Sequence, residues 1–193
     1  MDVVIIGAGY AGSLIASQLE NYDIVVFDKN KKRKNKSVTT FREVVDEGAI
    51  KKTYSKLTFM NTKGTKVEYD FNEEIFAFVD YQKLCDSLWS DIEEKKVVSY
   101  DKKGVVLENG ERIEAKVVVD CSGIDGENLR RNSGINIPPR LIYITYETVD
   151  RLNVPDDTFY LIVGCSIYGG WIYPAKPSEI GAANLFKRKE NVY

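Results

Sequence analysis

The chain has 193 residues, of which 44% are hydrophobic and 29% are charged, and its formal net charge is −2. This composition is typical of a soluble globular protein, and the slight negative charge argues against a general polyanion-binding function. Histidine is absent, which excludes a Ser-His-Asp triad and any metal site that uses histidine ligands.

Residues 3–28 predict a strand, a helix and a second strand. Residues 3–6 form an uninterrupted apolar run, as expected of a parallel strand that is buried on both faces. Residues 11–20 have an apolar face with the spacing of a helix, and residues 24–27 form the next buried strand, which ends at Asp28.

The sequence after Asp28 predicts first a charged loop, then a short helix, and then β structure. The lysine run at 29–36 has no apolar period, so we expect a solvated loop; attraction of anionic lipid head groups is its alternative role. Residues 41–50 predict a short helix. Beyond it the apolar period becomes two, and the strands that flank Lys63-Gly64 predict a hairpin followed by a third strand.

A helix capped by Asp80 is predicted over residues 81–94, and three short strands follow it. Asn109-Gly110 separates the last two of these strands and is a strong hairpin signal. Residues 116–121 form another buried strand that ends in Ser122-Gly123, and beyond residue 138 the chain predicts four antiparallel strands.

The turn between the first strand and the first helix follows the pattern GxGxxG. A buried strand precedes it, a helix follows it and an acid ends the next strand, which is the context that this dinucleotide-binding fingerprint requires. The first glycine permits the tight turn, the second lets the backbone approach a diphosphate, and the third lets the helix pack against the strand. The alternative is a glycine-rich turn that binds nothing. The residues of the turn are Gly7, Ala8, Gly9, Tyr10, Ala11 and Gly12.

Asp28 lies about 20 residues beyond the turn, where an acid binds the 2′-hydroxyl of a ribose. A carboxylate there disfavours a 2′-phosphate, so NADP is not the expected ligand. The motif alone does not distinguish FAD from NAD. An NAD domain continues through about six parallel strands, whereas this chain turns to β structure after its second strand, and that interruption favours FAD, held by the turn together with Asp28 and Lys29.

The sequence therefore predicts an α/β protein with two lobes. The first is a Rossmann-like FAD-binding lobe that contains an inserted β-meander, over residues 1–52 and 80–137. The second is an antiparallel-sheet lobe for the substrate, over residues 53–79 and 138–193.

Several segments in this order resemble the geranylgeranyl reductase family of flavoproteins, within the p-hydroxybenzoate hydroxylase-like superfamily. The resemblance covers about residues 1–186. The GAGYAG turn and Asp28 form a motif that many flavoproteins share. The stretch ENGERIEAKVVVDCSG restricts the resemblance to this superfamily. Its most specific part resembles an aromatic-Pro-Gly motif that lines the prenyl-substrate cavity, and consists of Tyr168, Trp171-Ile172-Tyr173-Pro174 and Gly181.

The resemblance implies a flavin enzyme that reduces double bonds in prenyl chains or in other apolar substrates. It implies that Gly7, Gly9 and Gly12 hold the pyrophosphate of FAD, that Asp28 holds the adenosine ribose, and that Ser122 and Gly123 pass close to the cofactor. The residues implied to line the substrate are Tyr168, Trp171, Tyr173 and Pro174. For Trp171 and Tyr173, a place in the core of a sheet is the alternative.

The chain also departs from the family pattern. A cysteine-containing segment expected after the acid is replaced by the lysine run, and Tyr81 stands where an arginine often approaches the cofactor. A Gly-Asp motif that binds the ribityl and pyrophosphate groups is not reached before Tyr193. These departures favour, as an alternative, a shortened or partial flavoprotein subunit that is inactive without a partner chain.

The leading prediction is an FAD-dependent oxidoreductase that transfers hydride from reduced flavin to an apolar substrate. A plain NAD-binding module is a third alternative. No residue is identified as catalytic; Asp120 and Glu147 are possible proton donors that nothing singles out. The longest apolar runs are of strand length, the first strand leaves no room for a signal peptide, and the three cysteines are far apart. We therefore expect a cytoplasmic protein, open to peripheral membrane contact, without a metal or a nucleic-acid partner.

Overall fold

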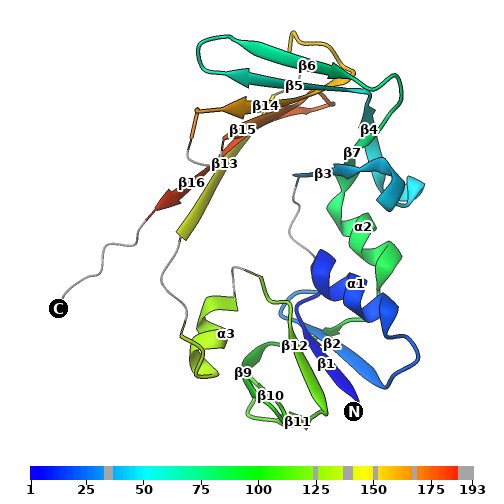
Figure 1. Cartoon of the computed structure of the whole chain (residues 1–193). Helices are drawn as coiled ribbons and strands as arrows, with labels where there is room; N and C mark the ends of the chain where they lie inside the picture. Colours follow the sequence, from blue (N-terminus) through cyan, green and yellow to red (C-terminus); the bar gives the residue numbers. More distant parts are fainter. Residues whose placement is uncertain (33–36, 124–125, 137–140, 150–151, 167–168, 187–193) are drawn as a thin grey trace, which may run out of the picture. The chain divides into compact units, whose positions relative to one another are not determined.

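The computed structural model describes residues 1–32, 37–123, 126–136, 141–149, 152–166 and 169–186, without the side chains of residues 37, 141–146, 149 and 183–186. The chain divides into two compact units, which are described separately (Figure 1). Unit 1 comprises Met1–Ser37 and Asp80–Ile137, and unit 2 comprises Val38–Val79 and Pro138–Tyr193.

Unit 1 is built on a parallel sheet with the strand order β12-β1-β2-β8. The strands are β1 (Val3–Ile6), β2 (Ile24–Asp28), β8 (Glu93–Glu94) and β12 (Val117–Asp120). β1 is buried along its whole length, which explains its uninterrupted apolar sequence. Helices α1 (Tyr10–Gln18) and α2 (Tyr81–Leu88) contact each other in the same unit. The helix predicted over residues 81–94 is wrong beyond Leu88, because residues 93–94 pair with β2 as strand β8. The predicted Rossmann-like start is confirmed.

A small antiparallel sheet completes unit 1. Its strands, in the order β11-β10-β9, are β9 (Val97–Asp101), β10 (Gly104–Leu107) and β11 (Arg112–Glu114). The hairpin predicted at Asn109-Gly110 joins β10 to β11 and is confirmed. The short helix α3 (Glu127–Asn132) follows β12 and contacts β9. Val105 and Leu107 pack with Val4 and Phe27, so the two sheets share one core.

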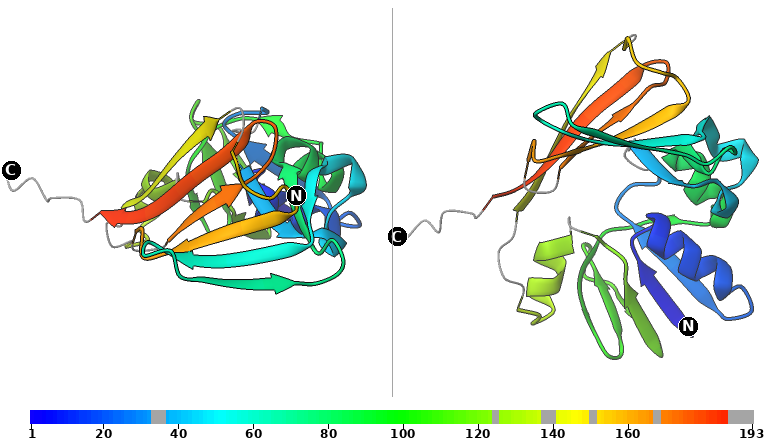
Figure 2. Two further views of the ribbon diagram at one scale, coloured as in Figure 1. Left: turned by 90° about the horizontal axis from the view of Figure 1, so that it is seen from above. Right: turned by 45° about the horizontal axis from the view of Figure 1, so that its top comes forward.

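Unit 2 contains a larger sheet with the order β13-β16-β15-β14-β5-β6, which Figure 2 shows from two further sides. Its strands are β5 (Lys56–Asn61), β6 (Lys66–Asp70), β13 (Leu141–Val149), β14 (Thr158–Val163), β15 (Gly170–Tyr173) and β16 (Ser178–Phe186). All neighbours are antiparallel except the pair β5–β14, which is parallel. The Lys63-Gly64 hairpin and the four antiparallel strands beyond residue 138 are confirmed.

The second sheet of unit 2 has the order β3-β7-β4, with β3 (Ser37–Phe41), β4 (Ile50–Tyr54) and β7 (Phe76–Asp80). The single helix predicted over residues 41–50 is wrong: two short 3₁₀ turns, Arg42–Val44 and Glu47–Ala49, lie there instead. Asp46 closes the second turn by accepting the amide hydrogen of Gly48 at 2.8 Å. A valine pair and a glycine lower the helix propensity of this stretch.

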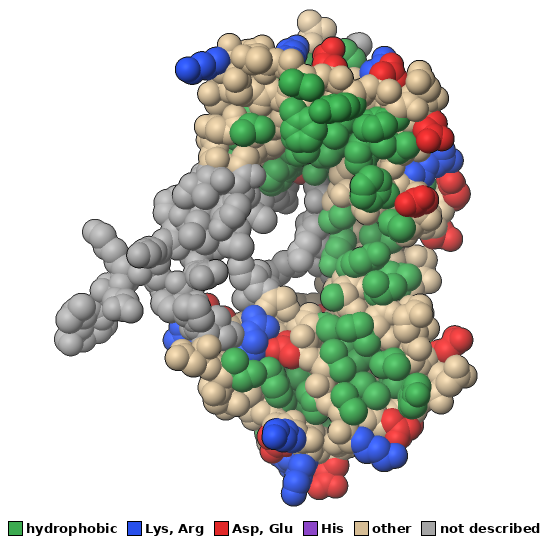
Figure 3. Space-filling model, viewed as in Figure 1, with side chains coloured by type: hydrophobic (Ala, Val, Ile, Leu, Met, Phe, Trp, Pro, Cys, Tyr) green, Lys and Arg blue, Asp and Glu red, His purple; other side chains and the backbone are tan. Residues whose placement is uncertain are grey.

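The core of unit 2 consists largely of aromatic side chains. Tyr54, Phe78, Phe159 and Tyr173 are buried together, and their strands come from both sheets. Hydrophobic side chains gather over this part of unit 2 in the space-filling view (Figure 3). Because β3 and β4 belong to the same sheet as β7, residues 38–52 group with unit 2, whereas the sequence prediction placed them in the first lobe.

Candidate functional site

The glycine turn lies directly after β1 and is held between β2 and β12. Gly7 has φ of +100°, and its amide donates a hydrogen bond of 2.7 Å to the carbonyl of Phe27. A Cβ atom at Gly7 would lie 2.5 Å from the carbonyl oxygen of Cys121 and 2.9 Å from Cα of Ser122. Only glycine satisfies both the left-handed conformation and this close approach.

Gly12 lets the first helix approach the turn. A Cβ atom there would overlap the carbonyl oxygen of Gly7, so even alanine would push α1 away from the end of β1. The next residue, Ser13, is buried and donates its hydroxyl hydrogen to the carbonyl of Ala8 at 3.2 Å. The helix therefore begins in direct contact with the backbone of the turn, as this fingerprint requires.

The carboxylate of Asp28 lies against the turn. Its Oδ2 accepts the amide hydrogen of Ala8 at 2.8 Å, and its Oδ1 accepts that of Asn30 at 2.9 Å. A carboxylate oxygen can accept more than one hydrogen bond, so both oxygens retain capacity for a ligand hydroxyl. The contact of Asp28 with a ribose stays a prediction, and so does that of its exposed neighbour Lys29.

The amide groups of the turn divide into two sets. Those of Gly7, Ala8 and Tyr10 are used within unit 1, the last by the phenol oxygen of Tyr81 at 2.9 Å. Within the described part of the chain, the other three donate to no side chain and to no loop carbonyl: Gly9, Ala11 and Gly12. Since α1 also lacks a side-chain cap, its first turn offers amides to an external anion.

The role of Tyr81 at this place was not predicted. Tyr81 is the first residue of α2 and is buried, and its hydroxyl would lie 3.1 Å from a Cβ atom at Gly9. The contact between α1 and α2 brings a residue 71 positions away to the first turn of α1. The only sequence signal for this role was the resemblance, since the family that the chain resembles often has an arginine at this position.

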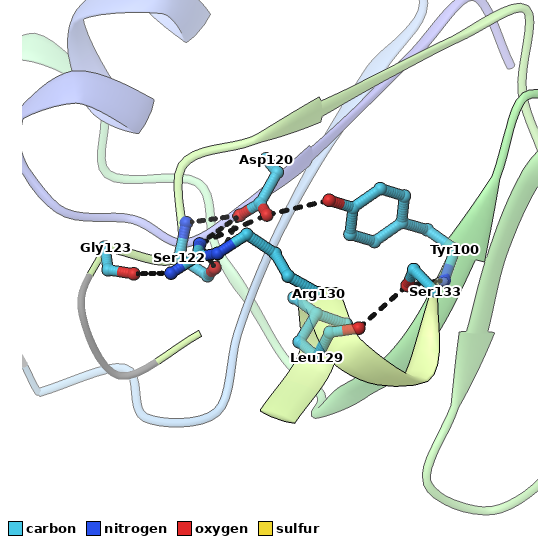
Figure 4. Close-up of polar contacts among 7 residues, drawn as sticks. All are labelled: Tyr100, Asp120, Ser122, Gly123, Leu129, Arg130 and Ser133. Carbon is cyan, nitrogen blue, oxygen red and sulfur yellow. Dashed lines mark hydrogen bonds and ion pairs between the residues drawn. The ribbon is translucent and has the colours of Figure 1, made fainter. Parts of the chain in front are cut away.

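A polar network holds the loop after β12, where the sequence predicted cofactor contacts for Ser122 and Gly123 (Figure 4). Asp120 accepts hydrogen bonds from the amide and the hydroxyl of Ser122 and from the phenol of Tyr100, the last at 2.9 Å. Arg130 on α3 pairs with Asp120 at 3.2 Å and also donates to Ser122 Oγ and to the carbonyl of Gly123.

The network also shifts the ionisation of its members. Burial raises the pKa of Asp120, but hydrogen bonds from Ser122, Tyr100 and Arg130 outweigh it and keep this pKa below its ordinary value. Burial, and then the contact with Asp120, raise the pKa of Tyr100 to about 12. Burial also raises the pKa of the Cys121 thiol, which favours the unreactive thiol form. At the centre of the network, the ion pair between Asp120 and Arg130 therefore holds Ser122 in place beside Gly7.

The residues predicted to line a substrate in unit 2 have different surroundings. Tyr168 lies outside the described residues. Tyr173 and Pro174 are buried, and the ring of Tyr173 lies 5.1 Å from that of Phe159 and 5.3 Å from that of Phe78. Trp171 is only half-buried, with its ring centroid 6.3 Å from that of Tyr173. Its partly exposed ring makes Trp171 the better candidate for contact with a ligand.

One charged residue in this unit was missed. Glu179 on β16 is buried, at 4% exposure, and accepts the indole hydrogen of Trp171 at 3.2 Å. A signal was present in the sequence, since a glutamate interrupts an otherwise small and apolar strand. Of the two proton-donor candidates named from sequence, Asp120 belongs to the network of unit 1, and Glu147 is exposed on β13.

Neither a metal site nor a membrane-spanning helix is found among the residues that the structure describes. No group of three or more metal-ligating side chains lies close enough together to bind a metal ion in that part of the chain. None of the helices there is both long and apolar enough to cross a membrane. Four residues of the lysine run, 33–36, lie outside the described ranges, so its proposed contact with anionic lipids stays a prediction.

Comparison with protein-family models and with curated proteins finds no match. Solved structures do match. A geranylgeranyl bacteriochlorophyll reductase-like protein from Thermoplasma acidophilum has a TM-score of 0.77 at 15% identity, over 95% of this chain and 56% of its own length. 2-Methyl-3-hydroxypyridine-5-carboxylic acid oxygenase has a TM-score of 0.66 at 17% identity, over 99% of this chain and 60% of its own.

A third match is PqsL from Pseudomonas aeruginosa, described as a probable FAD-dependent monooxygenase. Its TM-score is 0.64 at 18% identity, over 98% of this chain and 61% of its own length. The chain therefore spans less than two thirds of each of these three structures. At such identities the likeness establishes the fold, and the α/β fold predicted from the sequence is confirmed.

Proposed function

We propose that this chain is an FAD-dependent oxidoreductase whose glycine turn binds the adenosine diphosphate half of the cofactor. Its fold is shared with a structure described as a flavoprotein/dehydrogenase and with a probable FAD-dependent monooxygenase. The observation that supports the proposal most is the position of Asp28, whose carboxylate lies against a turn in which two glycines are sterically required.

The residues of the turn fit an ADP group. The amides of Gly9, Ala11 and Gly12 would bind the diphosphate, whose charge the amino end of α1 favours. The free acceptor capacity of Asp28 would bind a ribose hydroxyl. Ser122 and Gly123 would contact the cofactor beside Gly7, from a loop that the Asp120–Arg130 pair holds. When bound, FAD supplies the hydride-transfer chemistry.

The proposed substrate is apolar, such as a prenyl chain, and the reaction is reduction of an isolated double bond. The half-buried Trp171 supports this substrate class, together with the aromatic rings packed behind it in unit 2. Aromatic side chains offer a large apolar area at a small cost in conformational entropy. Tyr173 and Pro174 would then support this surface from the core rather than touch the substrate.

The cofactor proposal is tested on the purified chain by its absorbance spectrum and by mass spectrometry of any small molecule that it releases. We expect FAD. Asp28→Ala should weaken FAD binding about tenfold or more, because hydrogen bonds to a charged group contribute about 1.5–3 kcal/mol. Asp23→Ala, at the other end of the same strand, is the control and should leave binding unchanged. A colourless protein that binds NAD in place of FAD would contradict the proposal.

The reaction is tested separately, on protein that retains FAD and has been reduced by dithionite without oxygen. Mixing with geranylgeraniol should reoxidise the flavin and yield a product heavier by two hydrogens. If the protein holds FAD but reduces no prenyl alcohol, the partial subunit that requires a partner chain is the better description. Consumption of oxygen together with a hydroxylated product would instead indicate an oxygenase, as two of the compared structures are described.

A further inference from the structure

The larger sheet of unit 2 buries a carboxylate beside an indole ring. Among the residues that the structure describes, Glu179 is the only charged residue that is buried. It lies on β16 opposite Tyr173 of β15, and two residues further along β16, Gly181 lies opposite Trp171. Residues two apart on a strand share a face, so Glu179 and Gly181 lie on the face that carries Trp171.

The indole of Trp171 lies directly over Gly181. A Cβ atom at position 181 would overlap Cζ2, Cε2 and Nε1 of the indole, so any larger residue would displace the ring. At the same edge, Nε1 donates its hydrogen to Oε1 of Glu179 at 3.2 Å. Two contacts therefore fix the orientation of the ring: packing over Gly181 and the hydrogen bond to Glu179.

Stability alone does not explain a glutamate at this position. Taking a carboxylate out of water is costly, and apolar residues of similar volume often replace buried charged groups without loss of stability. The charge also acts on its surroundings: after burial, it contributes to the raised pKa of Tyr54 and of Tyr173. A function for the carboxylate beyond packing accounts for its presence better.

We infer that Glu179 is a positioning residue, which holds the indole of Trp171 flat over Gly181 as the contact surface for an apolar ligand. This inference rests on the proposed function, because it assumes that the ligand is an apolar chain. Glu179 would act only through the indole. An aromatic ring fixed in one orientation loses less conformational freedom on binding than a mobile one, so the hydrogen bond would appear as ligand affinity.

The test uses the full chain with Trp89→Phe, because the protein has two tryptophans and this change leaves Trp171 as the only one. In this parent we compare Glu179→Met, which removes the acceptor at similar volume, with Glu179→Gln, which keeps an acceptor oxygen. Gly181→Ala displaces the ring directly. Glu147→Ala, an exposed glutamate of the neighbouring strand β13, is the matched control.

Two readouts are measured after circular dichroism has shown that each variant is folded. The first is the emission maximum and acrylamide quenching of Trp171 without ligand; we expect a shift in Glu179→Met and Gly181→Ala only. The second is quenching of Trp171 by bromoundecanol, an apolar chain with a heavy-atom quencher. We expect five- to tenfold weaker binding in the same two variants, and binding within about twofold of the parent in Glu179→Gln and Glu147→Ala.

The possible failures are distinguishable. Equal quenching in the parent and in Glu179→Met, with unchanged emission, would overturn the inference while leaving the proposed function intact. Absence of quenching in the parent would overturn both the apolar-ligand part of the proposed function and this inference. Equal losses in Glu179→Gln and Glu179→Met would also overturn it, because the acceptor oxygen would then not be what positions the ring.

Discussion

Units 1 and 2 each contain one candidate binding surface, and the two are constructed in opposite ways. In unit 1 the candidate surface is backbone: it consists of amides at the start of α1, and Gly7 and Gly12 let this helix and the turn pack closely against the end of β12. In unit 2 it is a large side chain, Trp171, which is oriented by Glu179 and by the space over Gly181. A backbone site tolerates no added atom, whereas a side-chain site depends on the packing behind it.

The sharpest way to break this comparison is to add one methyl group in unit 1. In Gly12→Ala the new Cβ overlaps a backbone carbonyl, and no side-chain rotation can relieve that overlap. We expect the free energy of unfolding to fall by more than about 4 kcal/mol, at the upper end for a single substitution, and FAD binding to be lost. Chemical denaturation and FAD titration measure the two effects.

Gly110→Ala is the control for the added methyl group itself. Gly110 has a positive φ of +86°, which the helical Gly12 does not share, but nothing lies within 4 Å of a Cβ atom there. Its cost should be limited to backbone strain, about 1 kcal/mol. If Gly12→Ala cost no more than Gly110→Ala, close approach would not be what requires glycine at position 12, and the backbone description of the site would be wrong.

In unit 2 the corresponding prediction removes a ring instead of adding a methyl group. Phe159→Ala empties a position between Tyr54, Phe76 and Tyr173, and should lower the free energy of unfolding by about 3–4 kcal/mol. Val163→Ala on the same strand is 59% exposed and should cost less than about 0.5 kcal/mol. Denaturation of both variants checks this; equal losses would show that the rings of unit 2 do not form a packed core.

The two surfaces also differ in how far the sequence predicted them. The turn was predictable because its constraint is local: the glycine spacing and Asp28 stand within one βαβ unit. The Asn109-Gly110 hairpin was predictable for the same reason. The contact between Glu179 and Trp171 was not predictable, because it depends on which strand of the sheet lies opposite, and the burial of Tyr173 was only one of two alternatives, because it depends on which face is covered.

Long-range strand pairing also explains why the helix predicted over residues 41–50 is wrong. Residues 41–50 have enough apolar residues to suggest a helix, but β3 and β4, on either side of this stretch, join a sheet with β7. β7, about thirty residues later in the chain, pairs with both of these strands, and the helix propensity of residues 41–50 contains no information about that pairing. In the same way, only the contact between α1 and α2 reveals that Tyr81 belongs to the turn.

A smaller effect is expected from the charged pair of unit 1. Arg130→Met leaves Asp120 without its cation in a mostly buried place, and should cost about 2 kcal/mol at neutral pH. The folded-state pKa of Asp120 is lowered, so the pair stabilises the protein above about pH 4 and less as pH falls through that pKa. The difference between the variant and the wild type should therefore shrink progressively as the pH is lowered below about 4.

Denaturation at several pH values measures this difference, and the neighbouring arginine provides the control. Arg131 pairs with Glu127 one helical turn away, and its side chain is 46% exposed. Arg131→Met should cost about 0.3–0.5 kcal/mol. A loss in Arg130→Met that stays constant down to the lowest pH at which both proteins remain folded would mean that the arginine contributes packing rather than charge.

The smallest effect is expected for Tyr81→Phe, which asks whether a side chain takes part in the backbone site. The hydroxyl of Tyr81 accepts the amide hydrogen of Tyr10 at 2.9 Å, so this hydroxyl lies beside the amides that we propose bind the diphosphate. Its loss should lower the free energy of unfolding by less than about 1 kcal/mol and weaken binding of FAD and of ADP about threefold to tenfold. Adenosine, which lacks the diphosphate, should bind equally to both proteins.

Tyr22→Phe makes the same chemical change at an exposed position beyond the far end of α1 and should alter neither quantity. Tighter FAD binding in Tyr81→Phe would mean that the hydroxyl competes with the diphosphate for the amide of Tyr10. The turn would then bind its anion through backbone alone, and the contrast between the two units would be sharper than we propose. A loss shared by FAD and ADP but not by adenosine would instead place one side chain among the amides.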